Sequence, residues 1–173
     1  FTAVYGEMYG LKDHSACSIR FEHPISGNKF SEKVYRAITL YELHLRYYFQ
    51  GLAYSGFPWV YHTVGSAIGV KALCYVKAGG MNRRMAGEDF YFIQKLVPAG
   101  GFFNLNKTIV FPSPRSSTRV PFGTGITISR LTGGSDEIFM TYNFQSFMEL
   151  KTMFWLIDKI FRCENNDLEF AYS

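Results

Sequence analysis

The sequence predicts an α/β fold, in which a small mixed sheet is flanked by helices and followed by a C-terminal helical extension. Two segments, 16–21 and 102–111, alternate apolar and polar residues with the period of a half-buried strand. Three others, 30–54, 86–96 and 137–162, carry apolar residues three and four positions apart, which is the spacing of one helix face. Strands interleaved with helices along one chain are typical of the α/β class.

The first third of the chain is expected to hold one strand and one long helix. Residues 1–29 show no other regular pattern, and Pro24 and Gly27 end the strand. Ser31 stands where an N-cap is expected for the helix over 30–54. The apolar face of that helix is formed by Val34, Ile38, Tyr41, Leu45, Tyr48 and Leu52.

The middle of the chain predicts a strand followed by a short helix. Residues 59–71 are strand-like but are interrupted at the Gly65-Ser66 pair. A glycine inside a strand marks either a bulge or the close approach of a ligand or another backbone, and both interpretations stand here. Residues 72–78 predict a short helix, which the Gly79-Gly80 pair closes in the C-cap position.

Two adjacent acids open the helix over 86–96. Glu88 and Asp89 fall in its first turn, where the helix dipole favours negative charge. The ordinary interpretation is a charged start on a packed helix. The surroundings favour a functional interpretation, because a double glycine precedes the acids and an arginine-bearing loop follows them. The expected apolar face consists of Phe90, Ile93 and Leu96.

A loop-rich arm over 112–135 precedes the last helix. Prolines stiffen the arm, glycines loosen it, and Arg115, Arg119 and Arg130 are spaced along it. The helix over 137–162 is rich in aromatic residues, and its apolar face either packs on the core or rests on a membrane or a partner. Packing on the core is the favoured interpretation.

Length and composition limit the class of protein. The 173 residues suffice for one domain with a sizeable core, expected over residues 1–135, with a C-terminal helix and tail over 136–173. The net charge of +4 includes no block of like charges, which argues against a nucleic-acid tail and suits a phosphate-bearing small molecule. Three widely spaced cysteines form no zinc motif and are expected to be free thiols in a reducing compartment.

Three stretches of the chain carry a resemblance to a known family. They are Gly65-Ser66-Ala67, Tyr75 to Gly80, and Gly87-Glu88-Asp89-Phe90 followed by Lys95-Leu96. Their order resembles the C-terminal, acceptor-side half of a family 2 glycosyltransferase of the GT-A fold. The segment from Ser113-Pro114-Arg115 to Arg119 is similar to the one that follows in some bacterial members. The resemblance covers roughly residues 15–130 and leaves the last helix outside.

The resemblance implies an inverting transfer of a sugar from a nucleotide-sugar donor to an acceptor hydroxyl. In that family the second acid of the pair is the general base, which falls on Asp89 in this chain. Glu88 would orient the site or bind an acceptor hydroxyl.

The resemblance also implies binding residues around these acids. Gly79 and Gly80 would let the backbone approach the donor. Arg115 and Arg119 would neutralise the leaving diphosphate, because paired arginine–phosphate contacts are strong. The sugar pocket would be lined by Gly65, Ser66 and, with less weight, His62.

Other implied parts lie outside the chain. In that family a nucleotide-binding half comes first and ends in a DxD-type motif that holds a divalent metal, Mg²⁺ or Mn²⁺, whereas no such motif is recognised here. The chain is therefore expected to be an acceptor-side portion that is inactive or weak without the missing half. The expected partners are a nucleotide-sugar donor and a saccharide or lipid-linked acceptor. A peripheral membrane contact and a homodimer are possible further interactions. No nucleic-acid partner is expected. The expected location is the cytoplasm, including the inner face of the membrane.

A non-catalytic saccharide-binding or protein-interaction module is the alternative. It rests on the 18% of aromatic residues and on the long C-terminal helix. A module of this kind would bind a saccharide or partner without a nucleotide-sugar, whereas a transferase would need Arg115 or Arg119 for donor binding.

Overall fold

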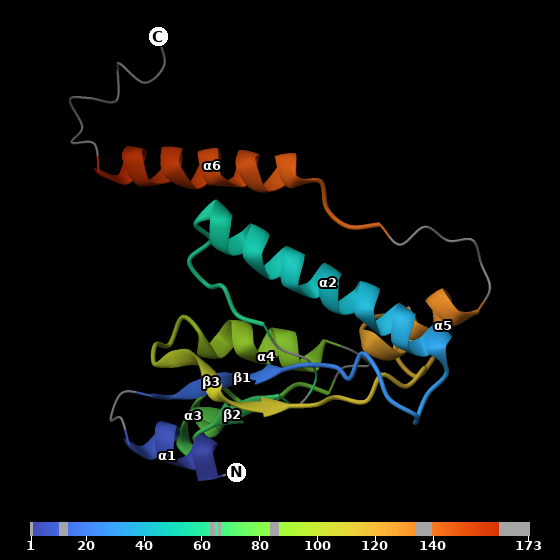
Figure 1. Cartoon of the computed structure of the whole chain (residues 1–173). Coiled ribbons are helices and arrows are strands. Elements are labelled where there is room, and N and C mark those ends of the chain that lie inside the picture. Colours follow the sequence, from blue (N-terminus) through green and yellow to red (C-terminus); the bar gives the residue numbers. More distant parts are fainter. Residues whose placement is uncertain are drawn as a thin grey trace. The chain divides into compact units, whose positions relative to one another are not determined.

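The computed structural model describes residues 2–10, 14–62, 65, 67–83, 87–133 and 140–162 of the chain. These residues form a mixed α/β structure with three strands and six helices, so the predicted fold class is confirmed (Figure 1). In chain order the elements are α1 (Thr2–Gly10), β1 (Ala16–Phe21), α2 (Glu32–Ser55), β2 (Ile68–Val70), α3 (Ala72–Lys77), α4 (Glu88–Leu96), β3 (Phe102–Val110), α5 (Thr124–Thr132) and α6 (Phe144–Arg162).

The chain divides into two compact units. The first consists of Phe1–Leu43 and Tyr61–Phe139, and the second of His44–Val60 and Met140–Ser173. The helix α2 begins in the first unit and ends in the second. Each unit has its own packing and is described by itself below.

The strands of the first unit form one mixed sheet with β1 in the centre. β1 is antiparallel to β2 and parallel to β3. The parallel register is regular from Ala16 to Ile19 and then shifts, so that Phe21 pairs with Val110. Because the two strands are parallel, the segments that follow β1 and β3 leave the sheet at the same edge. These segments contain His23 and the arginine-bearing arm.

The central strand is buried on both faces of the sheet. Cys17 packs with Met8 of α1 on one face. Ala16 packs with Phe92 and Leu96 of α4 on the other face. Figure 1 shows α1 and α4 on opposite sides of the sheet. Alternating side chains of β1 therefore hold the two helix layers together.

A third cluster joins α2 to α5. Ala37 and Ile38 of α2 enclose Ile128 of α5, and all three side chains are buried. Partly buried side chains at the border of this cluster are Val34, Tyr41 and Leu131. This contact holds α5, which lies within the arm, against the first half of α2.

In the second unit, the second half of α2 packs closely on α6. A Cβ placed on Gly51 would lie 2.5 Å from ring atoms of Phe147, so the absence of a side chain at Gly51 permits the approach. Phe147 is the buried side chain of α6. Further ring contacts join Tyr47 to Phe147, Tyr54 to Phe144 and Phe57 to Phe154.

Several predicted elements are confirmed with small changes at their ends. The strand over 16–21 is β1, and the strand over 102–111 ends one residue earlier, at Val110. The long helix follows Ser31 and continues to Ser55. The apolar residues of these segments recur with a clear period, and such a period is the most reliable sign of secondary structure in a sequence.

Two helices, α1 and α5, were not predicted from the sequence. Residues 1–29 were expected to be irregular apart from one strand, and this is wrong because α1 occupies Thr2–Gly10. Two glycines weaken the helix signal of α1, and Val4 and Met8 hold it against the sheet. The arm expected to be loop over 112–135 contains α5, whose β-branched residues disfavour a helix until the burial of Ile128 stabilises it.

The strand expected over 59–71 is confined to Ile68–Val70. It pairs only with Ala16 to Ser18 of β1. Tyr61 and His62 instead pack their rings on sheet residues, against Phe102 and Phe21 respectively. The aromatic residues in the first part of this segment therefore pack on the sheet without joining it as a strand.

Two helices also differ in detail from their predictions. The buried face of α4 consists of Phe92, Ile93 and Leu96, whereas Phe90 is 47% exposed. The last helix was expected from residue 137 and begins at Phe144, with residues 140–143 not helical. Residues 137–139 lie outside the described residues.

Replacing Gly51 by Ala is expected to destabilise the second unit. The added methyl group would overlap the Phe147 ring, at a cost of roughly 1–3 kcal/mol for overpacking, which exceeds the gain of about 1 kcal/mol in helix propensity. Trp59 and Trp155 both lie in the second unit, so tryptophan fluorescence during urea unfolding measures its stability.

The matched control is Gly6→Ala in α1, where an added Cβ meets nothing within 4 Å. This variant should gain about 0.5–1 kcal/mol in the first unit and leave the tryptophan transition unchanged. A tryptophan transition of Gly51→Ala at or above the wild-type urea midpoint would contradict the packing of Gly51 on Phe147.

Candidate functional site

The acid pair opens α4 as the sequence predicts. Gly87, the N-cap, has φ 73° and ψ 15°, a left-handed conformation that glycine adopts at little cost. Glu88 and Asp89 occupy the first turn and are half-buried. The Asp89 carboxylate accepts a hydrogen bond of 2.8 Å from the backbone N–H of Phe90. The helix start thus concentrates two carboxylates where backbone N–H groups favour negative charge.

The arm reaches the start of α4 through one aromatic contact. A Cβ on Gly87 would lie 3.0 Å from the Phe122 ring, so this residue of the arm packs directly before the acids. The arm is also tied to α5, because the Ser117 N–H donates to the carbonyl oxygen of Gly125 at 3.0 Å. Arg115 and Arg119 flank Ser117 and are exposed. Both arginines therefore lie on a segment that is held by the packing of Phe122 and by the hydrogen bond of Ser117.

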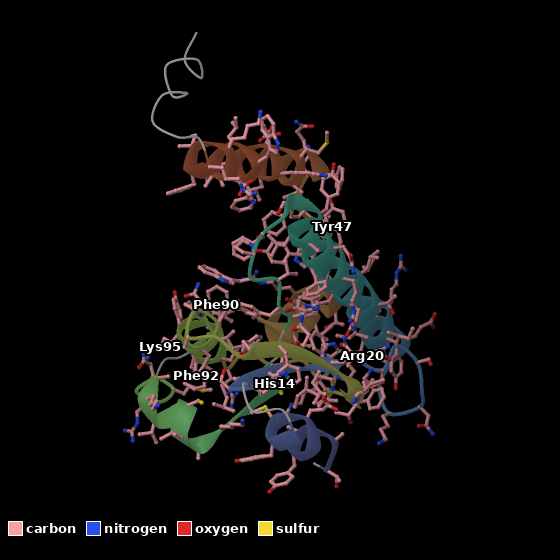
Figure 2. All side chains as sticks on the ribbon, turned by 90° about the vertical axis from the view of Figure 1, so that its left-hand side faces the viewer. His14, Arg20, Tyr47, Phe90, Phe92 and Lys95 are labelled. Atoms are coloured by element: carbon pink, nitrogen blue, oxygen red, sulfur yellow. The ribbon has the colours of Figure 1, made fainter. Side chains whose placement is uncertain are left out.

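The double glycine contacts a different part of α4. Gly79 and Gly80 both have positive φ, and Gly80 lies against the ring of Tyr75. That ring contacts Phe92, and Lys95 donates a hydrogen bond of 3.4 Å to the carbonyl oxygen of Ala78. These partners lie about one to two helical turns beyond the acids. Figure 2 shows Phe92 and Lys95 on α4, with Phe92 directed towards α3 and Phe90 on the other side of the helix.

The predicted sugar-pocket residues precede β2. His62 is half-buried and its ring lies edge-on to Phe21, with the centroids 4.7 Å apart. Gly65 is exposed and has φ 52°. Ser66 lies outside the described residues. The ring contact of His62 therefore places it against Phe21 of β1.

A buried polar network lies where β1 ends. It was not predicted from the sequence. Glu42 of α2 accepts two hydrogen bonds at one carboxylate oxygen, from the backbone N–H of His23 at 2.8 Å and from its Nδ1 at 2.6 Å. The other ring nitrogen, Nε2, lies 3.3 Å from the Thr124 hydroxyl at the start of α5. The side chains of His23 and Glu42 are 0% and 12% exposed. One network therefore joins β1, α2 and α5.

Tyr41 completes this network. Its ring contacts the His23 ring, and its hydroxyl is hydrogen-bonded to Thr124. Burial raises the pKa of Tyr41, and the nearby Glu42 charge adds to that rise, while the Thr124 hydrogen bond opposes it. The phenol is therefore neutral over the physiological pH range and serves as a hydrogen-bonding group.

One sequence signal could have identified this network. Glu42 falls among the apolar face positions Ile38, Tyr41 and Leu45, where a charged residue must find a buried partner. No pattern in the sequence identifies that partner, because His23 and Thr124 lie 19 and 82 residues away along the chain.

The described residues hold no group of three or more His, Cys, Asp or Glu side chains that could bind a metal ion. Within the same described ranges, no helix combines the length and apolar character required to cross a membrane.

Comparison with known proteins gives no match for this chain among protein-family models, curated proteins or solved structures.

Replacing Thr124 by Val is expected to destabilise the first unit by about 1–3 kcal/mol, because the isosteric change leaves His23 Nε2 and the Tyr41 hydroxyl without their shared partner. Thr39→Val is the matched control, since its exposed hydroxyl bonds only to Tyr35 in its own helix. Urea unfolding followed by circular dichroism compares the two variants. Equal losses would show that the buried network contributes no more than a surface threonine.

Proposed function

We propose that the first unit is the acceptor-side part of a GT-A-like glycosyltransferase, and that it contributes the general base for an inverting sugar transfer. The observation that carries the proposal is the pair of half-buried carboxylates, Glu88 and Asp89, in the first turn of α4. The arginine-bearing arm ends against the residue directly before them. The family resemblance of the sequence supports the same assignment.

Asp89 is the proposed base. An acceptor hydroxyl must lose a proton as its oxygen attacks the anomeric carbon of the donor sugar. The new bond joins the acceptor oxygen to that carbon, the bond from the carbon to the diphosphate oxygen breaks, and the proton passes to the Asp89 carboxylate. Attack from the face opposite the leaving diphosphate inverts the anomeric carbon. The nucleoside diphosphate leaves with the electron pair of the broken bond.

Glu88 is proposed to bind a neighbouring hydroxyl of the acceptor. An ionised carboxylate accepts hydrogen bonds at two oxygens, so it can hold a sugar hydroxyl without taking its proton. The hydrogen bond from the Phe90 N–H to Asp89 restrains the base. Packing of Phe122 on Gly87 restrains the turn that carries both acids.

Arg115 and Arg119 are proposed to hold the diphosphate. Guanidinium groups bind phosphate oxygens through paired, charge-assisted hydrogen bonds, and these gain strength as negative charge develops on the leaving group. Gly79 and Gly80 are proposed to admit the donor close to the backbone, with Gly65, Ser66 and His62 near the sugar. The donor nucleotide, the sugar and the acceptor are not specified by these residues.

The proposal includes a divalent metal in the complete enzyme. The described residues contain no group of three or more His, Cys, Asp or Glu side chains that could hold it. The cytoplasm is the proposed location. Cys17 and Cys74 are free thiols, which suits a reducing compartment.

Saccharide binding without transfer is the second candidate. The rings of Phe90 and Tyr91 are 47% and 41% exposed beside the acid pair, and aromatic faces stack well on sugars. In this case Asp89 would accept a hydrogen bond from a bound sugar and would take no proton from it.

Replacing Asp89 by Asn is expected to lower kcat for sugar transfer roughly 10²- to 10⁴-fold, because the amide cannot accept the proton. The full-length protein is assayed with a panel of nucleotide-sugars, and release of the nucleoside diphosphate is measured. Asp158→Asn on α6 is the matched control, since Asp158 is exposed and pairs with Arg162. Equal activity in both variants would remove Asp89 from the role of base.

Replacing Arg115 or Arg119 by Ala is expected to weaken nucleoside diphosphate binding by roughly 1.5–3 kcal/mol for each lost charged contact, or about 10- to 150-fold. Arg20→Ala is the control, because Arg20 is exposed on β1 and pairs with Glu22. Isothermal titration of the full-length protein with nucleoside diphosphate gives the affinities. Saccharide binding that persists without any nucleotide affinity would favour the second candidate function.

A further inference from the structure

The side chains of Glu42, His23 and Thr124 form a linear series of polar contacts within the first unit. The Glu42 carboxylate lies 2.6 Å from Nδ1 of His23, and Nε2 on the other side of the ring lies 3.3 Å from the Thr124 hydroxyl. Carboxylate, imidazole and hydroxyl in this order are the arrangement that activates a hydroxyl nucleophile in hydrolytic enzymes of unrelated folds. Such an arrangement is recognised by its geometry, and here α2, the segment after β1 and α5 bring it together.

The positions of the hydrogens in this series follow from the partners. An ionised carboxylate only accepts hydrogen bonds, so Nδ1 of His23 donates to Glu42. In the neutral imidazole Nε2 is then an acceptor, and the Thr124 O–H is the donor that faces it. The phenol of Tyr41 is hydrogen-bonded to Thr124 and can donate to its oxygen. The hydrogen of the Thr124 hydroxyl is thus directed at a base whose tautomer the carboxylate fixes.

Thr124 is the member of the series that lies nearest to solvent. The His23 side chain is 0% exposed, whereas Thr124 is only half-buried. A Cβ placed on the preceding residue, Gly123, would meet nothing within 4 Å, so there is open space beside the hydroxyl-bearing turn. Gly123 has φ 99°, a conformation that residues with side chains rarely adopt. The base is therefore shielded from water while its hydroxyl partner lies next to open space.

The first turn of α5 supplies donors for a developing negative charge. Thr124 is the first residue of this nine-residue helix, and the first four N–H groups of a helix have no partner within it. The N–H groups of Gly125 and Ile126 lie in the same turn, at the positive end of the helix dipole. Backbone N–H groups of this kind stabilise the single oxyanion that forms when a hydroxyl attacks a carbonyl carbon. The helix start and the buried base thus meet at one hydroxyl.

We propose that Thr124 is the nucleophile of an acyl-transfer site for carboxylic esters, with His23 as its general base and Glu42 as the residue that positions the base. The Thr124 oxygen bonds to the ester carbonyl carbon, and its proton passes to Nε2 of His23. The bond from that carbon to the alcohol oxygen breaks, and the alcohol leaves with the proton from His23.

Water completes the turnover. Its oxygen bonds to the carbonyl carbon of the acyl-threonine, and one of its protons passes to Nε2 of His23. The bond from the carbon to the Thr124 oxygen breaks, that oxygen regains the proton, and the carboxylic acid leaves. This activity is independent of the proposed sugar transfer at Asp89.

Two reagents test the proposal with the whole chain. p-Nitrophenyl acetate transfers its acetyl group to an activated hydroxyl and releases coloured nitrophenol, and a fluorophosphonate forms a stable oxygen–phosphorus bond as fluoride leaves. Peptide mass spectrometry is expected to find the acetyl group and the phosphonate on Thr124. Treatment with the fluorophosphonate should abolish the acetylation of Thr124 that p-nitrophenyl acetate otherwise produces.

Variants of the three residues separate catalysis from a structural role. Thr124→Ser keeps the hydroxyl and should still be labelled by the fluorophosphonate. His23→Asn removes the base and should lower the first-order rate constant of labelling roughly 10²- to 10⁴-fold. Glu42→Gln should lower the same rate constant by a similar factor and leave the apparent affinity for the reagent unchanged. A structural role alone would leave the rate constant of the folded protein unchanged.

Thr132→Val is the matched control on α5. The Thr132 hydroxyl donates to the carbonyl oxygen of Ile128 in its own helix, so this variant should be labelled at the wild-type rate. Circular dichroism checks that each variant is folded at the temperature of the assay.

Two outcomes would overturn the proposal. The first is the absence of both adducts from Thr124 in the wild-type chain, including the case in which only lysine or cysteine side chains react. The second is labelling of Thr124 at the wild-type rate in folded His23→Asn or Glu42→Gln. Because the adducts are mapped on the wild-type chain, the first outcome decides the matter even where a variant fails to fold. Either outcome would leave the series of Glu42, His23 and Thr124 with a structural role.

Discussion

The central strand β1 is the constraint on which the first unit depends. Its neighbouring residues Ala16 and Cys17 are both fully buried, and they face opposite helix layers. The same strand supplies the pairing edge for β2 and for β3. A shift of its register by one residue would exchange the two faces and turn Ser18 and Arg20 towards the layer that holds Met8. The positions of α1, α3 and α4 follow from that register.

A series of contacts leads from the end of β1 to the proposed site. His23 is held by Glu42 and lies next to Thr124, the first residue of α5. Two residues earlier, Phe122 packs on Gly87, and the acids follow. The buried pair is therefore connected to the acid-bearing turn through packed neighbours. Rigid placement of this kind is what a catalytic carboxylate needs.

Helix α6 carries apolar residues on more than one side, and its sequence pattern does not say which side packs on α2. Its aromatic residues predicted a helix with an apolar face, and both core packing and an outer contact agreed with that pattern. The close approach of Phe147 to Gly51 assigns one face to α2. Met153, Leu156, Ile157 and Ile160 lie on another side of the helix and are partly exposed.

The sequence by itself determined the elements whose side chains repeat with a clear period, namely β1, most of β3, and the helices α2 and α4. It also placed Glu88 and Asp89 in a first helical turn, because local spacing decides that position. Only the tertiary structure decided α1 and α5, since glycines and β-branched residues give weak local signals and burial stabilises both helices. The same holds for the network of His23, Glu42 and Thr124. Its members meet because strand, helix and arm converge at one edge of the sheet, which no local pattern encodes.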